Sequence, residues 1–402
     1  TYFGNAEEME YCYPLMKDWA DFIDRGDAAR GERKYLFDFM DTFGDWLALD
    51  GPTPTSFKGS TNDTFISSVY YYRSVQIVRQ MAEVLNKAED AVHYCELEEK
   101  IKKAVLDEFF TPTGRLAIDT QAAYVIALKF KVYLDRERIV EQFKARLKQD
   151  MYQIKCGFVG APLLCTVLAE AGEYELAYDF LLKEGFPSWL YSVNLGATTI
   201  WERWNSVMPD GTISDTGMNS LNHYAYGSVM EFVYAYAAGI RPLEAGFGKV
   251  AIAPHPDVRI PEIACSYDSV SGRYVCNWKI EKDGTFTVHV EVPFNCEAVV
   301  ELPGYEKEQM TLSAGSYDFS YEPKEDLRKP YGRNTTLSRI AKDGQAMGIL
   351  GKYTPALAGI AASGDPEMGA NSLEDLSHIG FLPFDPAALE TAIGEISNIV
   401  VK

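Results

Sequence analysis

The sequence predicts a mainly α-helical domain, followed by a small antiparallel β-sandwich and a short helical tail. Apolar residues recur at helical spacing up to about residue 238, and they alternate with a period of two between about 239 and 322. Residues 323–402 begin with a charged linker and become rich in Ala and Gly. A chain of 402 residues has room for two or three domains, which we expect at 1–238, 239–322 and 323–402.

The first of these regions predicts a series of amphipathic helices joined by short loops, an arrangement that gives antiparallel pairs. We expect helices at 64–86, 92–110, 135–147, 161–171 and 173–184. Asp135 can cap the third of them, and Gly172 separates the last two.

The second region predicts a β-hairpin with one buried face. Apolar residues alternate with polar ones in 274–280 and again in 286–292, and Asp283-Gly284 supplies the turn between them. With the β-rich segments around 249–268 and 297–302, this hairpin indicates a small antiparallel sandwich. In the tail, Ser372-Leu-Glu-Asp375 and Asp385-Pro386 predict two helix starts.

Charge and composition exclude several functions. The chain has 38 basic and 58 acidic residues, a formal net charge of −20 that repels phosphate backbones, so we expect no nucleic-acid partner. No apolar run reaches the length of about 18 residues that a membrane helix needs, and no basic-then-apolar leader is present. We therefore expect neither a membrane partner nor a signal peptide.

Cysteine and histidine usage excludes further chemistry. The 7 cysteines have irregular spacings without a Cys-x-x-Cys pair, which is typical of small buried side chains in a reducing, cytoplasmic compartment. No His or Cys pair has metal-ligand spacing, and no phosphate-binding glycine motif or Gly-x-Ser-x-Gly elbow occurs. We expect no metal and no cofactor.

The segment around Glu202 is the strongest candidate site. Its carboxylate lies between the indoles of Trp201 and Trp204 and beside the guanidinium of Arg203. Apolar walls raise the cost of the charged form, Arg203 lowers that cost, and indole faces pack on the C–H faces of sugar rings. The pattern favours a general base in a carbohydrate pocket. An ion pair between Glu202 and a basic residue such as Arg203 explains the local sequence equally well.

Other candidates also lie in loops between the helices. Asp45 and Trp46 could supply a hydroxyl acceptor and a stacking face, although an N-cap Asp with a core Trp is the better interpretation of these residues alone. His223 could contact a sugar, but a lone histidine is more often a hydrogen-bonding residue than a catalyst. Trp189, in Pro187-Ser-Trp-Leu-Tyr191, is a further indole for a sugar ring.

A series of motifs combines these segments. They are Tyr13-Pro-Leu-Met-Lys-Asp-Trp19, Phe43-Gly-Asp-Trp-Leu47, Asp119-Thr-Gln-Ala-Ala-Tyr124, Gly157-Phe-Val-Gly160, Pro187-Ser-Trp-Leu-Tyr191, Gly196-Ala-Thr-Thr-Ile-Trp-Glu-Arg-Trp204, Met218-Asn-Ser-Leu-Asn-His-Tyr-Ala-Tyr-Gly227 and Ile252-Ala-Pro-His-Pro256. With these motifs in this order, residues 12–280 resemble the bacterial α-L-rhamnosidase family of glycoside hydrolases.

The resemblance implies an (α/α)6 barrel followed by a β-sandwich, and inverting hydrolysis of terminal α-L-rhamnosyl groups. It places Glu202 at the position of the general base that activates water. Trp46 and His223 match residues that line the rhamnose subsite, and Asp45 is their neighbour.

The sequence departs from the family at the proton donor. The family carries its acidic Glu in an Asp-Cys-Pro…Glu…Gly-Asp segment, which these residues lack, so we expect a partial barrel. The chain is then either a fragment of a longer enzyme or a degenerate homologue, and in both cases it is expected to be inactive or weakly active. Uncovered barrel helices predict self-association. The alternatives are a non-catalytic carbohydrate-binding protein and another (α/α)6 inverting glycosidase.

Overall fold

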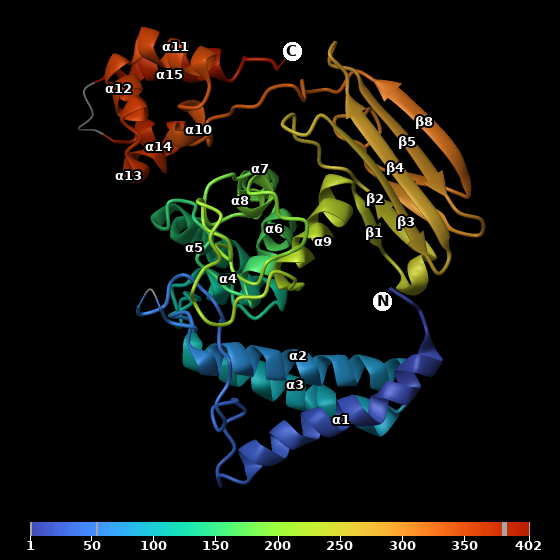
Figure 1. Cartoon of the computed structure of the whole chain (residues 1–402). Coiled ribbons are helices and arrows are strands. Elements are labelled where there is room, and N and C mark those ends of the chain that lie inside the picture. The colour runs from blue at the N-terminus through green and yellow to red at the C-terminus, as the bar shows by residue number, and fades with distance from the viewer. Residues whose placement is uncertain (1, 54, 380–383, 402) are drawn as a thin grey trace. The chain divides into compact units, whose positions relative to one another are not determined.

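The structure is a computed structural model that describes residues 2–53, 55–379 and 384–401. It forms two compact units (Figure 1). The first contains Gly4–Leu147 and Gln153–Met230, and the second contains Glu231–Lys402 together with Lys148–Tyr152 and the N-terminal end.

The first unit is helical. Its α-helices are α1 (Ala6–Ala28), α2 (Asp63–Val84), α3 (Ala88–Phe109), α4 (Gln121–Lys129), α5 (Arg136–Gln149), α6 (Ala161–Glu170), α7 (Tyr174–Leu181) and α8 (Trp189–Asn194), and a 3-10 turn η1 (Ala225–Val229) follows. All five predicted helices are confirmed to within a few residues. The N–H of Arg138 donates to the Asp135 side chain at 3.2 Å, as expected of an N-cap. Gly172 adopts a positive φ of 88° between α6 and α7, a conformation that favours glycine.

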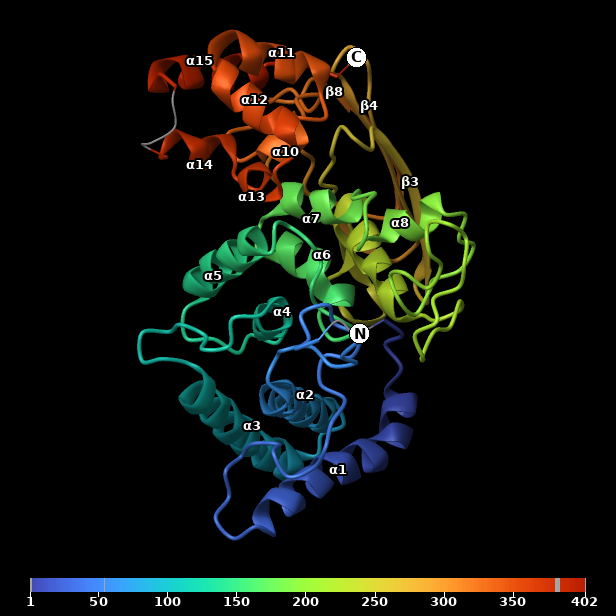
Figure 2. The same cartoon turned by 60° about the vertical axis from the view of Figure 1, so that its left-hand side comes forward.

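Helices α1, α2 and α3 lie side by side in both views (Figure 1, Figure 2). Fully buried side chains of α2 and α3, such as Val75 and Ile101, form part of the core of the unit. On α1, however, Tyr11, Leu15 and Trp19 recur every four residues and are exposed. These side chains form an uncovered apolar stripe, the kind of surface for which self-association was expected. Self-association stays a prediction, which size-exclusion chromatography over a range of concentrations would test.

The second unit resumes at Glu231, within α9 (Met230–Phe232), and continues through the π-helical turn η2 (Val233–Ala237) into two four-stranded sheets. The strands are β1 (Ile240–Pro242), β2 (Lys249–Ile252), β3 (Glu262–Ser269), β4 (Gly272–Ile280), β5 (Phe286–Val292), β6 (Glu297–Val300), β7 (Met310–Leu312) and β8 (Gly315–Tyr321). One sheet has the order β1-β2-β6-β7 and the other β3-β4-β5-β8. A 3-10 turn, η3 (Ala245–Phe247), lies between β1 and β2.

The predicted hairpin is β4 and β5, with Gly284 in the turn at φ 96°. Trp278, Phe286 and Val290 lie in the core between the sheets. The expectation of a wholly antiparallel sandwich is wrong in one respect, because β2 and β6 pair in parallel. The chain forms β3, β4 and β5 of the other sheet before it returns as β6, and a long crossover of this kind permits parallel pairing.

The tail is a small helical bundle with its own core. Its helices are α10 (Leu337–Ile340), α11 (Gly344–Tyr353), α12 (Pro355–Ser363), α13 (Pro366–Gly369), α14 (Leu373–Ser377) and α15 (Pro386–Ile396). Both predicted helix starts are confirmed, because Ser372 forms a capping box with Asp375 and Asp385 caps α15. Leu350, Leu357 and Ile393 pack in the centre of this bundle. In the part of the chain that the structure describes, no helix is long and apolar enough to cross a membrane.

Candidate active site

Two loops of the first unit, around residues 46–49 and 155–158, are connected by hydrogen bonds between their backbones. The N–H of Leu49 donates to the carbonyl of Lys155 at 2.7 Å, and the N–H of Phe158 donates to the carbonyl of Trp46 at 2.9 Å. Gly157 lies at the closest approach, where an added Cβ would be 2.1 Å from the Trp46 carbonyl oxygen. A glycine at position 157 is therefore required for this contact.

Replacing Gly157 with Ala is expected to lower the free energy of unfolding by about 1–3 kcal/mol, because the methyl group would push the two backbones apart. Urea denaturation of the chain measures this loss. Gly185→Ala is the matched control, since an added Cβ there has no neighbouring atom within 4 Å. Equal stability of the two variants would contradict the close packing of the loops.

Asp45 fastens the same two loops. It is fully buried, and its two carboxylate oxygens accept hydrogen bonds from the N–H groups of Gly157 at 2.9 Å and Val159 at 3.1 Å. Burial raises the pKa of Asp45 to about 7, against the lowering effect of these two hydrogen bonds. A side chain with no exposed surface cannot contact a sugar. The predicted hydroxyl-acceptor role of Asp45 is therefore wrong, as is its interpretation as an N-cap, and Asp45 is a positioning residue.

Glu202 is half-buried and held by the segment that follows it. Its backbone N–H donates to the carbonyl of Ser220 at 2.9 Å, and its Oε2 accepts from the N–H of Ser220 at 2.7 Å. No ion pair joins Glu202 to Arg203 or to another base among the described residues. The guanidinium of Arg203 donates instead to the carbonyls of Gly217 at 2.9 Å and Met218 at 3.1 Å. The ion-pair interpretation of Glu202 is therefore wrong.

His223 lies on the segment that is hydrogen-bonded to the one carrying Glu202. Its N–H donates to the carbonyl of Ile200 at 2.8 Å, so that the segments around 200–202 and 220–223 run next to each other. The imidazole stacks on Phe158 with a centroid distance of 4.9 Å and on Tyr224 at 5.5 Å. The backbone N–H of Phe158 donates to the carbonyl of Trp46, and the Phe158 ring stacks on His223. Hydrogen bonds and ring contacts therefore connect the loops that carry Trp46, His223 and Glu202.

Trp46 is half-buried within an aromatic cluster. Its ring stacks on Phe57, with a centroid distance of 5.4 Å and an interplanar angle of 11°, and meets Phe43 edge to face. The guanidinium carbon of Arg203 is 5.6 Å from the centroid of Phe57. Sequence reasoning missed Phe43 and Phe57. Phe43 stands inside the motif Phe43-Gly-Asp-Trp-Leu47 and could have been noticed there, whereas no local signal distinguishes Phe57.

Trp189, Trp201 and Trp204 are buried, each with at most 7% of its surface exposed. The Trp204 ring stacks on Tyr226 at 3.9 Å, and Trp189 meets Trp204 edge to face while its Nε1 donates to the Tyr226 carbonyl. Little of each side chain is exposed, and their contact with a sugar stays a prediction. Trp189, Trp204 and Tyr226 form a packed aromatic cluster close in sequence to Glu202.

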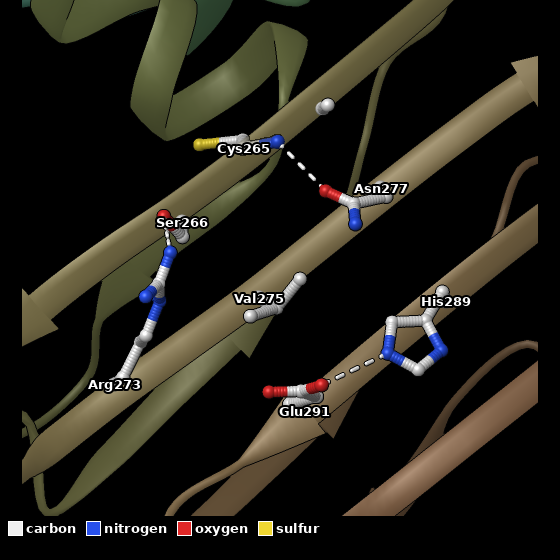
Figure 3. Close-up of a pocket in the computed structure, with 8 residues that line it drawn as sticks. Cys265, Ser266, Arg273, Val275, Asn277, His289 and Glu291 are labelled. Carbon is white, nitrogen blue, oxygen red and sulfur yellow. Dashed lines mark hydrogen bonds and ion pairs between the residues drawn. The ribbon is translucent and has the colours of Figure 1, made fainter.

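A separate hollow of about 460 Å³ lies on the sheet β3-β4-β5-β8 of the second unit (Figure 3). His289, on its floor, contacts Asp318 through Nδ1 at 2.7 Å and Glu291 through Nε2 at 3.2 Å. The polar groups of His289 are thus already paired with neighbouring side chains. Among the residues that the structure describes, no group of His, Cys, Asp and Glu side chains could hold a metal ion.

The pKa of His289 is raised, first by its hydrogen bond with Asp318 and then by the one with Glu291. The stabilisation that these bonds give is therefore complete below the pKa of an unfolded histidine, and it is lost as the pH rises through the higher folded value. We expect Asp318→Asn to lower the pKa of His289, measured by NMR titration of the imidazole. Asp268→Asn removes a carboxylate that lies 3.8 Å from Arg273, and is the control. An unchanged titration of His289 in Asp318→Asn would contradict this prediction.

Comparisons with known proteins agree with this architecture. Residues 1–237 match the bacterial α-L-rhamnosidase six-hairpin glycosidase domain, and residues 239–316 match the bacterial α-L-rhamnosidase C-terminal domain. The fold is that of a six-hairpin glycosidase with an attached β-sandwich. The chain belongs to the bacterial α-L-rhamnosidase family, as its motifs indicated.

Relatives that are similar in sequence are named α-L-rhamnosidases. The chain is 36% identical over 338 residues to an α-L-rhamnosidase of Alteromonas sp. (strain LOR), a match that covers 79% of this chain and 36% of that protein. An α-L-rhamnosidase of Streptomyces avermitilis is 31% identical over 78% of this chain and 29% of its own length. The chain thus spans about a third of the length of these relatives.

Two solved structures are similar in fold. Native α-L-rhamnosidase from Aspergillus terreus superposes with a TM-score of 0.72 and 30% identity, over 79% of this chain and 37% of that one. The Streptomyces avermitilis enzyme, solved in complex with L-rhamnose, gives a TM-score of 0.71 and 30% identity, over 80% of this chain and 31% of that one.

Proposed function

We propose that this chain is the part of an α-L-rhamnosidase that binds the terminal α-L-rhamnosyl group and activates the attacking water, with inversion at the anomeric carbon. The observation that carries the proposal is the carboxylate of Glu202. It is half-buried and free of an ion pair among the described residues, and its segment is hydrogen-bonded to the segment that contains Ser220 and His223. The solved complex of the Streptomyces avermitilis relative with L-rhamnose supports this class of ligand.

The proposed role of Glu202 follows from its contacts. One oxygen, Oε2, is held by the Ser220 N–H, which fixes the direction of the carboxylate. We propose that the other oxygen, Oε1, accepts a proton from a water as that water attacks the anomeric carbon. General-base assistance of this kind contributes roughly 10²–10⁴-fold to a rate.

Inversion also needs a proton donor, a second carboxyl group roughly 6.5–9.5 Å from the base. Asp45 cannot serve, because its carboxylate is fully buried and both of its oxygens hold backbone N–H groups. Because the sequence also lacks the segment in which the family carries its acidic Glu, we propose that the described residues supply the base and the sugar subsite but not the acid. A natural rhamnoside, whose leaving oxygen must be protonated, is then a poor substrate for this chain alone.

The test compares an aryl α-L-rhamnoside with a rhamnose-containing disaccharide. We expect slow release of the nitrophenol, which leaves without acid help, and no measurable cleavage of the disaccharide. Cleavage of both at similar rates would refute the missing acid. Turnover of a different aryl glycoside in preference to the rhamnoside would favour another inverting glycosidase of the same fold.

A non-catalytic rhamnose-binding protein is the second candidate, and the burial of Asp45 favours it because no proton donor stands opposite Glu202 at this position. It predicts binding of L-rhamnose, observed by ligand NMR, without turnover of any aryl glycoside. For either candidate we propose a reducing cellular compartment, which the free state of the cysteines supports.

A further inference from the structure

An exposed aromatic surface lies beside Trp46. Phe43 has 77% of its surface exposed and Phe57 has 42%, although both side chains are large and apolar. Phe43 meets Trp46 edge to face, at a centroid distance of 5.7 Å and an angle of 88°, and Phe57 stacks on the same indole. We call the two phenylalanine rings, Phe43 and Phe57, the aromatic platform. Clustered exposed rings of this kind mark binding surfaces.

The platform is held in place by its own loop. The ammonium group of Lys58, the residue after Phe57, donates to the carbonyl of Thr42 and forms an ion pair with Asp63 at 2.8 Å. Gly44, the residue after Phe43, has a positive φ of 59°, and a Cβ there would lie 2.2 Å from the Asp63 carboxylate. The rings are therefore presented by a fixed backbone rather than by a loose loop, which lowers the entropic cost of binding.

The platform is continuous with the candidate site. The ring of Phe57 contacts both the indole of Trp46 and the guanidinium of Arg203. Arg203 follows Glu202 directly in the chain. Trp46 connects to His223 through Phe158. A ligand whose rhamnosyl group lies at Trp46 and His223 can thus extend over Phe43 without leaving the first unit.

We propose that the aromatic platform binds the leaving-group side of the substrate and selects rhamnosides with a planar aromatic aglycone. This inference rests on the proposed function, since it assigns the group attached to the rhamnose. Phenylalanine offers ring faces and no hydrogen-bonding atom, so Phe43 and Phe57 recognise an apolar face alone. A planar aryl group fits such a surface better than a pyranose ring, whose hydroxyl groups need polar partners at its edge.

The test uses thioglycosides, because a sulfur linkage resists hydrolysis and allows binding to be measured by calorimetry. The probes are methyl, 4-nitrophenyl and glucosyl 1-thio-α-L-rhamnosides. In the unmodified chain we expect the aryl compound to bind about tenfold more tightly than the methyl compound, as ring stacking provides. In Phe43→Ala this ratio is expected to fall to near one, while the affinity for the methyl compound stays unchanged.

Two variants serve as controls. Phe43→Trp restores an aromatic face and is expected to restore the preference for the aryl compound. Phe294→Ala removes a ring that is 90% exposed in the second unit, and is expected to change nothing. Because Phe43 is so exposed, replacing it with Ala should leave the urea midpoint of unfolding unaltered. Urea denaturation of the same samples measures this midpoint.

The outcomes separate the two proposals. If no rhamnoside binds to the unmodified chain, the proposed function fails and this inference with it. If the methyl compound binds but the aryl compound gains nothing, or keeps its gain in Phe43→Ala, only the platform is refuted. A gain for the glucosyl compound alone, lost in Phe43→Ala, would identify a sugar ring as the occupant and overturn the assignment to an aryl group.

Discussion

Asp45→Asn is expected to destabilise the chain by about 1–3 kcal/mol near pH 5, measured by urea denaturation. The amide oxygen of Asn can still accept one of the two N–H groups, from Gly157 or Val159. Its NH2 group, however, would face the other N–H, so one buried backbone donor would lose its partner. The buried position offers no water to replace that hydrogen bond.

The cost of this substitution should depend on pH. Burial raises the pKa of Asp45 from 3.8 to about 7, so between these values the folded chain holds a proton that the unfolded chain has released. Stability from this group is therefore greatest at low pH and is lost as the pH rises toward 7, with a slope of about 1.4 kcal/mol per pH unit at most. Asn does not titrate, and the difference between the wild type and Asp45→Asn should shrink between pH 5 and pH 8.

Asp210→Asn is the control for this pH dependence, because Asp210 is exposed in a loop of the same unit. Its stability is expected to follow the wild type at both pH values. A cost of Asp45→Asn that is equal at pH 5 and pH 8 would show that the Asp45 carboxyl group titrates at an ordinary value. The hydrogen bonds from Gly157 and Val159 would then offset the effect of burial on its pKa.

The elements of this fold were predictable where local physics decides them. Helices α2, α3, α5, α6 and α7, the Asp283-Gly284 hairpin and the caps at Ser372 and Asp385 follow from periodicity, turn residues and side-chain hydrogen bonds within a few positions. The parallel pairing of β2 with β6 was not predictable in this way, because it depends on how the chain crosses between two sheets.

In the candidate site too, local sequence predicted some features, whereas others depend on tertiary structure. The motif that contains Glu202 identified the carboxylate, but adjacency in sequence suggested partners that the structure does not use. Arg203 binds backbone carbonyls rather than Glu202, and Asp45 binds N–H groups from a loop more than a hundred residues away. The burial of Trp204 against Tyr226 and the exposure of Phe43 both depend on tertiary packing, which composition and spacing cannot reveal.

Glu202→Gln is expected to have the largest effect on catalysis. In this chain, the change should lower the proposed turnover of an aryl rhamnoside by roughly 10²–10⁴-fold in kcat, because the amide cannot take the proton of the attacking water. Binding should change little, since Gln keeps an oxygen that can accept from the Ser220 N–H at the position of Oε2. The measurement is a comparison of kcat and of the affinity for L-rhamnose in the two proteins.

Azide distinguishes loss of the base from a distorted site. Azide attacks the anomeric carbon without releasing a proton, so it forms a rhamnosyl azide, expels the nitrophenolate and needs no base. It should restore turnover in Glu202→Gln and leave the wild type unaffected, whereas Glu184→Gln, an exposed acidic residue of the same unit, should behave like the wild type. Failure of azide to restore turnover, together with a lowered affinity for L-rhamnose, would mean that Glu202 holds the sugar or the loop rather than the water.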